Sequence, residues 1–380
     1  MPWSTGPVDD RIKMIGMWER GESVQELAKR FGVTRQCVHK WIGRYKEEDR
    51  AGLVERSRAP HQSPNQTSPE LIDELLCLKR KHMNWGPVTL VDLMSERHGV
   101  RPMAPSTAGE ILERYGLVRR KKRRRRGKVP ATGPPYEIPG SGHTLTADYK
   151  GQFRVGSGRY CYPLTLAEPI SRYVFAVEGL SSTRIDDAKR VFKRIFCEWG
   201  VPEQIITDNG IPFCSPRSIG GLSELSKWWI KCGARPFRIE PGKPQQNGRH
   251  ERMHRTLKEA TASPPAASFR TQQRRFNTFR EEFNQVRPHQ ALGGKTPASR
   301  VRPFPGTMPR KFVDFEYPVD SLVRRVRSNG QIRWAGTKIF IGEVLIDELI
   351  ALVELDHGLF AIYFGPIRIG TLDASKHLVY

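Results

Sequence analysis

Residues 144–180 read TLTADYKGQFRVGSGRYCYPLTLAEPISRYVFAVEGL, and this stretch decides the kind of fold to expect. It contains three runs rich in apolar, β-branched and aromatic residues, separated by short turns, which predict three antiparallel strands. The next run, IDDAKRVFKRIFCEWG, has apolar residues at helical spacing, and EQIITDNG returns to a strand. Strands first, followed by alternating helix and strand, predict a mixed sheet flanked by helices, an α/β core over residues 143–303.

Two aspartates in this region stand where a strand ends. Asp148 closes the first strand in TADYKG, and Asp208 closes the fourth in ITDNG. Each interrupts an apolar run just before a turn, where a rigid sheet can hold an exposed acid for chemistry. Aspartate also favours turns, and either residue taken singly is better explained in that way. A role beyond the turn therefore depends on a third acid.

That third acid is Glu251, in the cation-rich stretch KPQQNGRHERMHRTLKE at residues 243–259. The stretch predicts a helix whose polar face carries Asn247, Glu251, Arg255 and Lys258. The opposite face is predicted to turn Met253, Leu257 and Ala260 into a core. One acid among cations is either an ordinary surface pair at i, i+4 spacing or a metal ligand flanked by groups that hold a phosphate backbone.

Asp148, Asp208 and Glu251 together form a ligand set suited to a hard divalent cation. Mg²⁺ or Mn²⁺ usually takes one or two carboxylates and completes its shell with water and substrate phosphate. Three carboxylates from two strand ends and a helix are enough for two such ions about 4 Å apart, one activating the nucleophile and one steadying the leaving oxygen. We therefore predict these three residues as metal ligands and catalytic groups, with the surrounding cations binding DNA.

The charge of the whole chain points to a polyanionic partner. Its 380 residues contain 63 Lys and Arg against 40 Asp and Glu, which gives a net charge of +23 and a pI near 10.1. Because no apolar run is long enough to span a bilayer and no signal pattern begins the chain, double-stranded DNA is expected rather than a membrane. The six cysteines are scattered without paired spacing, which argues against a zinc finger or a disulfide framework and fits the cytoplasm.

A DNA-reading module is predicted over residues 1–58. The stretch SVQELAKRFGVTRQCVHKWIGRYKE at residues 23–47 predicts two helices, capped by Ser23 and Thr34 and joined at Gly32, as in a helix-turn-helix. The exposed side of the second helix, predicted to enter a major groove, carries Arg35, Gln36, His39, Lys40 and Arg44. The alternative is a helical hairpin with a solvated polar face.

A second helical module and a basic linker follow. Residues 66–118 predict another helix-turn-helix, with a packing domain that never touches DNA as the alternative. Residues 119–142 combine a cation run with a Pro- and Gly-rich segment, which predicts a linker able to lie along phosphates. The predicted contacts are Arg119, Arg120, Lys121, Lys122, Arg123, Arg124, Arg125 and Arg126. A solvated or localisation-type charge run is the alternative.

The last segment, residues 315–380, alternates polar and apolar residues and predicts a small all-β barrel. Hairpin signals occur at Asn329-Gly330 and between Asp356 and Gly358. Residues 307–380 carry no net charge, which argues against this barrel as the main DNA anchor. A local basic patch of Arg324, Arg325, Arg327 and Arg333 is predicted on it.

Three phrases, TADYKG, IITDNGIPF and PGKPQQNGRHERMHRTLK in this order, resemble the catalytic core of the DDE transposases and retroviral-type integrases. The chain is most similar to bacterial insertion-sequence transposases that place helix-turn-helix modules before that core. The resemblance implies a ribonuclease H-like core, an SH3-like final barrel and catalytic acids at Asp148, Asp208 and Glu251.

This sequence departs from the family pattern in three places. The segment between the second and third acids is longer than in retroviral integrases, which predicts a longer loop and helix around CSPRSIGGLSELSKWW. Glu168 stands where relatives often carry Asp, but it is not one of the three acids. No zinc-binding His and Cys set precedes the core, so recognition of DNA ends is expected to rest on the helix-turn-helix modules.

The resemblance implies a DNA transposase that binds terminal inverted repeats, nicks the 3′ ends by metal-assisted hydrolysis and joins them to target DNA by transesterification. No covalent enzyme intermediate is implied. Because two ends must be processed together, a homodimer or a higher assembly on DNA is expected. Two other functions remain open: a DNA-binding regulator or end-binding protein with an unused core, and a nuclease that cuts without joining.

Overall fold

The computed structural model describes residues 8–56, 66–118, 142–216, 218–240 and 248–379, and the side chain of Arg249 is outside this description. The chain divides into two compact units, Met1–Gln66 and Thr67–Tyr380, each of which is described by itself. In the part of the chain that the structure describes, no helix is long and apolar enough to cross a membrane. All six cysteines lie in described residues and are free thiols.

The first unit is a three-helix module that contains the predicted helix-turn-helix. Its helices are α1 (Val8–Glu19), α2 (Val24–Arg30) and α3 (Arg35–Glu48), followed by the short helix η1 (Asp49–Leu53). Ser23 caps α2 through a capping box with Glu26, and the Thr34 side chain accepts a hydrogen bond from the backbone of Cys37 at the start of α3. The helix-turn-helix expectation is confirmed, and α1 adds a third helix that buries Met14 and Ile15 against the other two.

The second unit begins with another helical module, as predicted. It consists of α4 (Pro69–Lys81), α5 (Pro87–His98) and α6 (Pro105–Arg114), each with proline in its first turn. Their apolar faces share one cluster that includes Leu75, Leu90, Met94 and Leu112.

The predicted mixed sheet is confirmed in the region that follows. Its strands are β1 (Thr144–Tyr149), β2 (Phe153–Arg154), β3 (Tyr160–Ala167), β4 (Val174–Leu180), β5 (Gln204–Thr207) and β6 (Arg235–Arg238). The order is β2-β3-β1-β5-β6, and β4 pairs with β3. The strands β1, β3 and β4 are antiparallel neighbours, whereas β1, β5 and β6 run parallel.

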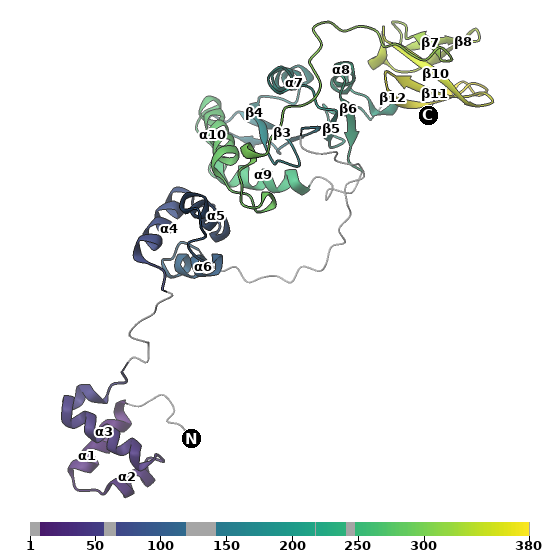
Figure 1. Ribbon diagram of the computed structural model, residues 1–380. Coiled ribbons are helices and arrows are strands. Elements are labelled where there is room, and N and C mark those ends of the chain that lie inside the picture. The colour runs from purple at the N-terminus through teal and green to yellow at the C-terminus, as the bar shows by residue number, and fades with distance from the viewer. Residues whose placement is uncertain (1–7, 57–65, 119–141, 217, 241–247, 380) are drawn as a thin grey trace. The chain divides into compact units, whose positions relative to one another are not determined.

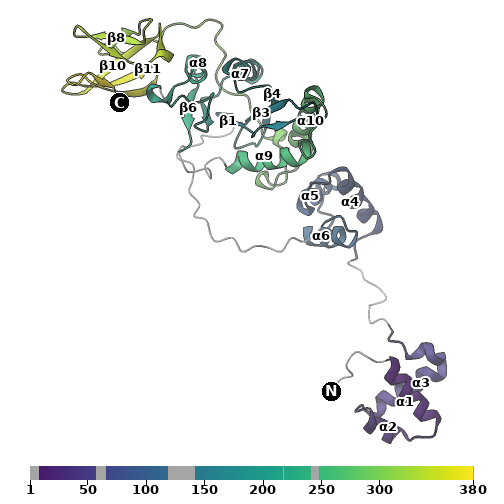
Figure 2. The same cartoon turned by 180° about the vertical axis from the view of Figure 1, so that it is seen from behind.

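Two pairs of helices cover the two faces of this sheet (Figures 1 and 2). The helices α7 (Ile185–Trp199) and α8 (Glu224–Cys232) pack on one face, together with Leu145, Ala147 and Ile205 of the strands. The helices α9 (Gly248–Thr261) and α10 (Phe269–Glu281) pack on the other face, against β3 and β4. The apolar stripe predicted for α7 is buried as expected, because its members recur every three or four residues.

Short helical segments connect these elements. One of them, η2 (Ile219–Gly221), precedes α8, and three others follow α10: η4 (Glu282–Val286), η5 (Gln290–Leu292) and η6 (Pro297–Ser299).

The final segment is all-β, as predicted, and forms a half-barrel. Its elements are β7 (Leu322–Arg325), β8 (Gln331–Trp334), β9 (Thr337–Phe340), η7 (Glu343–Leu345), β10 (Leu349–Asp356), β11 (Leu359–Phe364), β12 (Ile367–Asp373) and β13 (Leu378–Val379). The five-stranded sheet has the order β13-β12-β11-β10-β7, and β8 pairs separately with β9.

One of the two predicted hairpins is confirmed and the other is misplaced. Asp356 to Gly358 does turn β10 back onto β11. Asn329-Gly330 makes a turn, but the strands that it joins, β7 and β8, belong to different sheets. The actual β8–β9 hairpin turns at Ala335-Gly336, both with positive φ, 47° and 86°. Such backbone angles suit a two-residue hairpin turn, which usually has the sequence Asn-Gly. Because alanine stands in place of asparagine here, the sequence does not indicate the turn.

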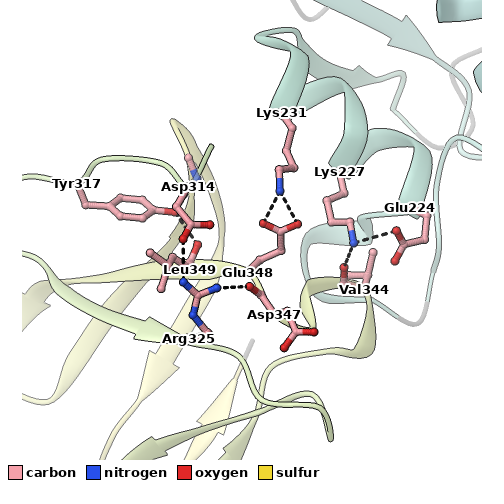
Figure 3. A network of polar contacts seen from close by, with 11 residues as sticks. Glu224, Lys227, Lys231, Asp314, Tyr317, Arg325, Val344, Asp347, Glu348 and Leu349 are labelled. Atoms are coloured by element: carbon pink, nitrogen blue, oxygen red, sulfur yellow. Dashed lines mark hydrogen bonds and ion pairs between the residues drawn. The ribbon is translucent and has the colours of Figure 1, made fainter. Parts of the chain in front are cut away.

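Contacts along α8 join the half-barrel to the core (Figure 3). The Lys231 ammonium lies 2.8 Å from both carboxylate oxygens of Glu348, and Lys227 donates to the carbonyl oxygen of Val344 at 2.7 Å. Beside these polar contacts, Ile230 is buried in the apolar cluster of the half-barrel.

Candidate active site

The two predicted aspartates lie at the ends of two neighbouring parallel strands of the sheet, β1 and β5. β1 and β5 run parallel with Thr146 opposite Ile206, and the same offset of 60 positions brings Asp148 level with Asp208. Because side chains alternate between faces and Leu145, Ala147 and Ile205 point to α7 and α8, both aspartates belong to the face that α9 covers. Neighbouring strands are about 4.8 Å apart, so the strand ends that carry the two aspartates are adjacent at the carboxyl edge of the sheet. The group of candidate ligands that the described residues bring within 4.8 Å of one another is Asp148, His250 and His254, and it includes neither Asp208 nor Glu251.

Asp208 also stabilises the turn that follows β5, which is the structural role that the sequence left open for this residue. Its Oδ1 accepts a hydrogen bond from the backbone N–H of Gly210 at 3.0 Å, and the Asn209 amide donates to the Ile239 carbonyl at 2.8 Å. This bond uses one oxygen, while a carboxylate has about four lone-pair sites. The turn therefore orients the acid and leaves acceptor capacity for a ligand.

Glu251 lies in the first turn of α9 and is exposed. The helix is fixed to the sheet by its other face, on which Met253 and Leu257 are buried as predicted. Ala260, predicted for the same face, is exposed, and this prediction was wrong. The buried stripe continues instead through Thr261, four positions after Leu257, so Ala260 falls at its edge.

Two histidines on α9, which the sequence interpretation missed, connect the helix to β1 and β3. The hydroxyl of Thr165 on β3 lies 2.6 Å from Nε2 of His250 and 2.7 Å from Nε2 of His254. The same hydroxyl donates to the backbone carbonyl of Asp148 at 2.9 Å, and Nδ1 of His250 lies 3.0 Å from the Thr146 hydroxyl. His250 and His254 therefore hold α9 to the two strands, while Glu251 lies on the exposed side of the helix.

Both histidines are neutral because they are buried. Burial lowers the pKa of His250 to about 3. Burial, and then electrostatic repulsion from His250 and Lys150 of a proton on the ring, lower the pKa of His254 to about 2. Nδ1 of His254 lies 3.8 Å from Oδ2 of Asp148, but with a neutral ring this contact is not an ion pair. The His254 side chain is 8% exposed and that of Asp148 is 16% exposed.

A signal for these histidines was present in the sequence. HERMH, residues 250–254, has the H-E-x-x-H spacing that places two histidines on one helix face and binds zinc in metalloproteases. Asp148, His250 and His254 do bring candidate ligand atoms within 4.8 Å of one another. Both nitrogens of His250 are engaged by threonine hydroxyls, however, which argues against His250 as a ligand. Five residues with two open positions form a weak pattern, and the metalloprotease arrangement is not present among the described residues.

The residues of this face fit a divalent cation. Asp148 and Asp208 offer carboxylate oxygens, the ligands that Mg²⁺ and Mn²⁺ prefer. Neither side chain is fully buried, so an ion held there keeps positions for water or a phosphate oxygen.

The predicted DNA-contacting residues are placed as follows. On α3, Arg35, Gln36, His39 and Lys40 are exposed, and the half-buried Arg44 holds its guanidinium carbon 5.0 Å from the centre of the Trp41 ring. Arg255 and Lys258 are exposed on α9. Asn247 and the run from Arg119 to Arg126 lie outside the described residues. Exposure agrees with a role in binding, and the DNA contacts themselves stay predictions.

Comparisons with family models match three parts of the chain. A model described as an integrase core domain matches residues 232–297, which include Glu251. Two models described as homeodomain-like domains match residues 6–54 and 37–112, the two helical modules before the sheet.

Individual relatives come from insertion elements and retroviruses. The insertion element IS476 uncharacterized 39.2 kDa protein of Xanthomonas euvesicatoria is 25% identical over 289 residues, covering 74% of this chain and 79% of that protein. The Pol polyprotein of feline endogenous virus ECE1 is 35% identical over 101 residues, 26% of this chain and only 9% of the polyprotein. The chain thus spans a small part of the retroviral relatives that it matches.

Among solved structures, the HTLV-2 integrase catalytic core domain in complex with magnesium matches 43% of this chain and 99% of its own, with 15% identity and a TM-score of 0.34. The simian T-cell lymphotropic virus intasome in complex with the PP2A regulatory subunit B56 gamma matches 76% of this chain and 91% of its own, with 14% identity and a TM-score of 0.39. The integrase core match, the homeodomain-like matches before it and the insertion-element relative lead to one conclusion: this chain is similar, in its successive parts, to the DDE transposases and integrases.

Proposed function

We propose that this protein is a DNA transposase that binds the terminal inverted repeats of its own element, nicks their 3′ ends and transfers them into target DNA. The observation that supports the proposal is the parallel register of β1 and β5, the neighbouring strands that lead to Asp148 and Asp208, together with the helix α9 that carries Glu251 on the same side of the sheet. With it we propose the finer assignments of a ribonuclease H-like core, an SH3-like barrel, assembly of at least two copies on DNA, and action in the bacterial cytoplasm.

In this proposal Asp148, Asp208 and Glu251 hold two divalent ions, Mg²⁺ or Mn²⁺. When bound, such ions supply Lewis-acid polarisation of the phosphodiester and lower the pKa of an attacking water or 3′-hydroxyl. The rigid sheet holds the aspartates at fixed separation, and the Thr165 hydroxyl fixes the backbone carbonyl of Asp148.

Cationic side chains around the acids provide the affinity for DNA. Arg255 and Lys258 follow Glu251 by four and seven positions and are exposed on α9, within reach of a phosphate backbone that approaches the acids. On α3 the exposed Arg35, Gln36 and Lys40 have the donors and acceptors that read base edges in a major groove. The basic run at 119–126 adds affinity that does not depend on sequence.

The test is Glu251→Gln in the full-length protein. This change keeps the size of the side chain and removes its charge, so end binding is expected to persist while nicking in Mg²⁺ falls by about a hundredfold or more, the scale of losing one charge-stabilising group. Binding is measured by gel shift on repeat-end DNA, and nicking on labelled ends. Glu259→Gln, the same change two turns along α9 at another exposed glutamate, is the matched control and should leave nicking unchanged.

Each outcome separates the competing functions. If Glu251→Gln nicks DNA as fast as the wild type, the assignment of Glu251 to the active site is wrong. A wild-type protein that binds ends without nicking them would be a DNA-binding regulator or end-binding protein. Nicked ends without joined products would identify a nuclease.

A further inference from the structure

The hydrogen bonds of Thr165 determine which nitrogen of His254 carries the proton. A hydroxyl donates one hydrogen bond and accepts two. The Thr146 hydroxyl donates to the carbonyl of Ala167, so the contact between His250 and Thr146 requires a proton on Nδ1 of His250, and Nε2 of that ring is an acceptor. The single proton of Thr165 is used by the Asp148 carbonyl and by Nε2 of His250, so the contact of Thr165 with His254 is satisfied only if His254 donates from Nε2–H. Among the described residues, Nδ1 of His254 has no acceptor within hydrogen-bond distance, since Oδ2 of Asp148 lies 3.8 Å away. We therefore assign His254 as the Nε2–H tautomer, with a lone pair on Nδ1.

That lone pair is directed at a carboxylate. Nδ1 of His254 lies 3.8 Å from Oδ2 of Asp148, and both atoms are acceptors. In the described part of the chain no hydrogen-bond donor serves Nδ1, although the side chain is more than nine-tenths buried. Two acceptors facing each other are unfavourable unless a water or a cation lies between them, and a cation binds both directly. Bonds from a divalent ion to nitrogen and to oxygen are each about 2.1 Å long, so one ion can reach both atoms across this distance.

We propose that Nδ1 of His254 is a ligand of the ion that Asp148 holds, and that this centre consequently takes Mn²⁺ or a similar first-row transition ion in preference to Mg²⁺. The proposal rests on the proposed function, because it concerns the metal of the same site. Imidazole nitrogen suits transition metals, whereas Mg²⁺ prefers oxygen ligands alone. A ligating histidine normally donates its other N–H to an oxygen that fixes the ring, and the Thr165 hydroxyl does so here.

His250 has a different role in this arrangement. Its two nitrogens contact the hydroxyls of Thr146 and Thr165 and its side chain is buried, so it positions Thr165 rather than the ion. The two rings meet edge to face with centroids 4.7 Å apart, which holds the His254 ring in place.

The direct test is pulsed electron paramagnetic resonance of Mn²⁺ bound to the full-length protein without DNA. Modulation of the electron spin echo by a directly bonded ¹⁴N nucleus is expected in the wild type. It should be absent in His254→Gln, whose amide can still donate to Thr165. Asp148→Asn should also lose the signal, which would show that the nitrogen belongs to the ion at Asp148. A nitrogen signal missing from wild-type protein saturated with Mn²⁺, or persisting in His254→Gln, overturns the proposal.

Metal affinities give a second measurement. In calorimetric titrations His254→Gln should bind Mn²⁺ at least about tenfold more weakly than the wild type, since even residues that only support a ligand contribute that much, and should bind Mg²⁺ nearly as before. An equal loss for both ions, or no loss, contradicts a nitrogen ligand.

Circular dichroism shows whether the variant folds. If His254→Gln unfolds, the wild-type nitrogen signal and its loss in Asp148→Asn decide the question. Nicking that depends on Glu251, combined with a Mn²⁺ spectrum showing oxygen ligands only, would reject His254 as a ligand and leave the proposed transposase intact. A nitrogen signal in a protein that never nicks DNA would support His254 as a metal ligand and reject the proposed transposase.

Discussion

At the scale of single residues, the Thr165 hydroxyl joins the backbone of Asp148 to both buried histidines of α9. Thr165→Val keeps the shape of the side chain but leaves two buried imidazole nitrogens without a partner, the Nε2–H donor of His254 and the Nε2 acceptor of His250. Each such group costs about 1–3 kcal/mol, so the free energy of unfolding in urea should fall by roughly 2–6 kcal/mol. Thr256→Val is the control, because that half-buried hydroxyl bonds only to a carbonyl of its own helix, and it should change stability by less than about 1 kcal/mol. Equal stabilities of the two variants would contradict the tautomers assigned above.

At the scale of an element, α3 depends on its cap to hold the groups predicted to meet DNA. The Thr34 side chain accepts from the backbone of Cys37 at 3.3 Å and so satisfies one of the unpaired donors of the first turn. Thr34→Ala should destabilise the start of α3 by about 1 kcal/mol, which corresponds to about fivefold faster amide exchange there, measured by hydrogen–deuterium exchange of the full chain. Thr34→Ser keeps the hydroxyl and should exchange like the wild type. Unaltered exchange in both variants would show that the cap contributes nothing.

At the scale of the whole molecule, the net charge of +23 should govern how DNA affinity responds to salt. Replacing the eight cations from Arg119 to Arg126 with glutamine should reduce the slope of log affinity against log salt by about 0.9 for each phosphate that the run neutralises, and equally for end and random DNA. Gel shifts across a series of salt concentrations measure this slope. Replacing Arg324, Arg327 and Arg333 in the neutral final segment should change it little. A larger effect from these three would make the half-barrel the main anchor.

Local chemistry in the sequence predicted much of this molecule. The apolar period of α7, the caps Ser23 and Thr34 and the apolar, β-branched run of β1 are properties of short stretches, and each formed where its stretch predicted. The same local rules failed at Ala335-Gly336, where a hairpin turns without its usual residues. They also failed at Ala260, which is exposed because it lies at the edge of the buried face of α9. Neighbouring residues are enough to form an element, but not to select its partner.

The sequence by itself determined the elements of the core and the two strand ends that carry Asp148 and Asp208. Only the tertiary structure decided that these ends are level, because that depends on the register between β1 and β5. It alone also brought Thr165 to His250 and His254, which are 85 and 89 positions away. Contacts over such distances follow from the docking of α9 on the sheet, which buries Met253 and Leu257 and so fixes where every other side chain of that helix falls.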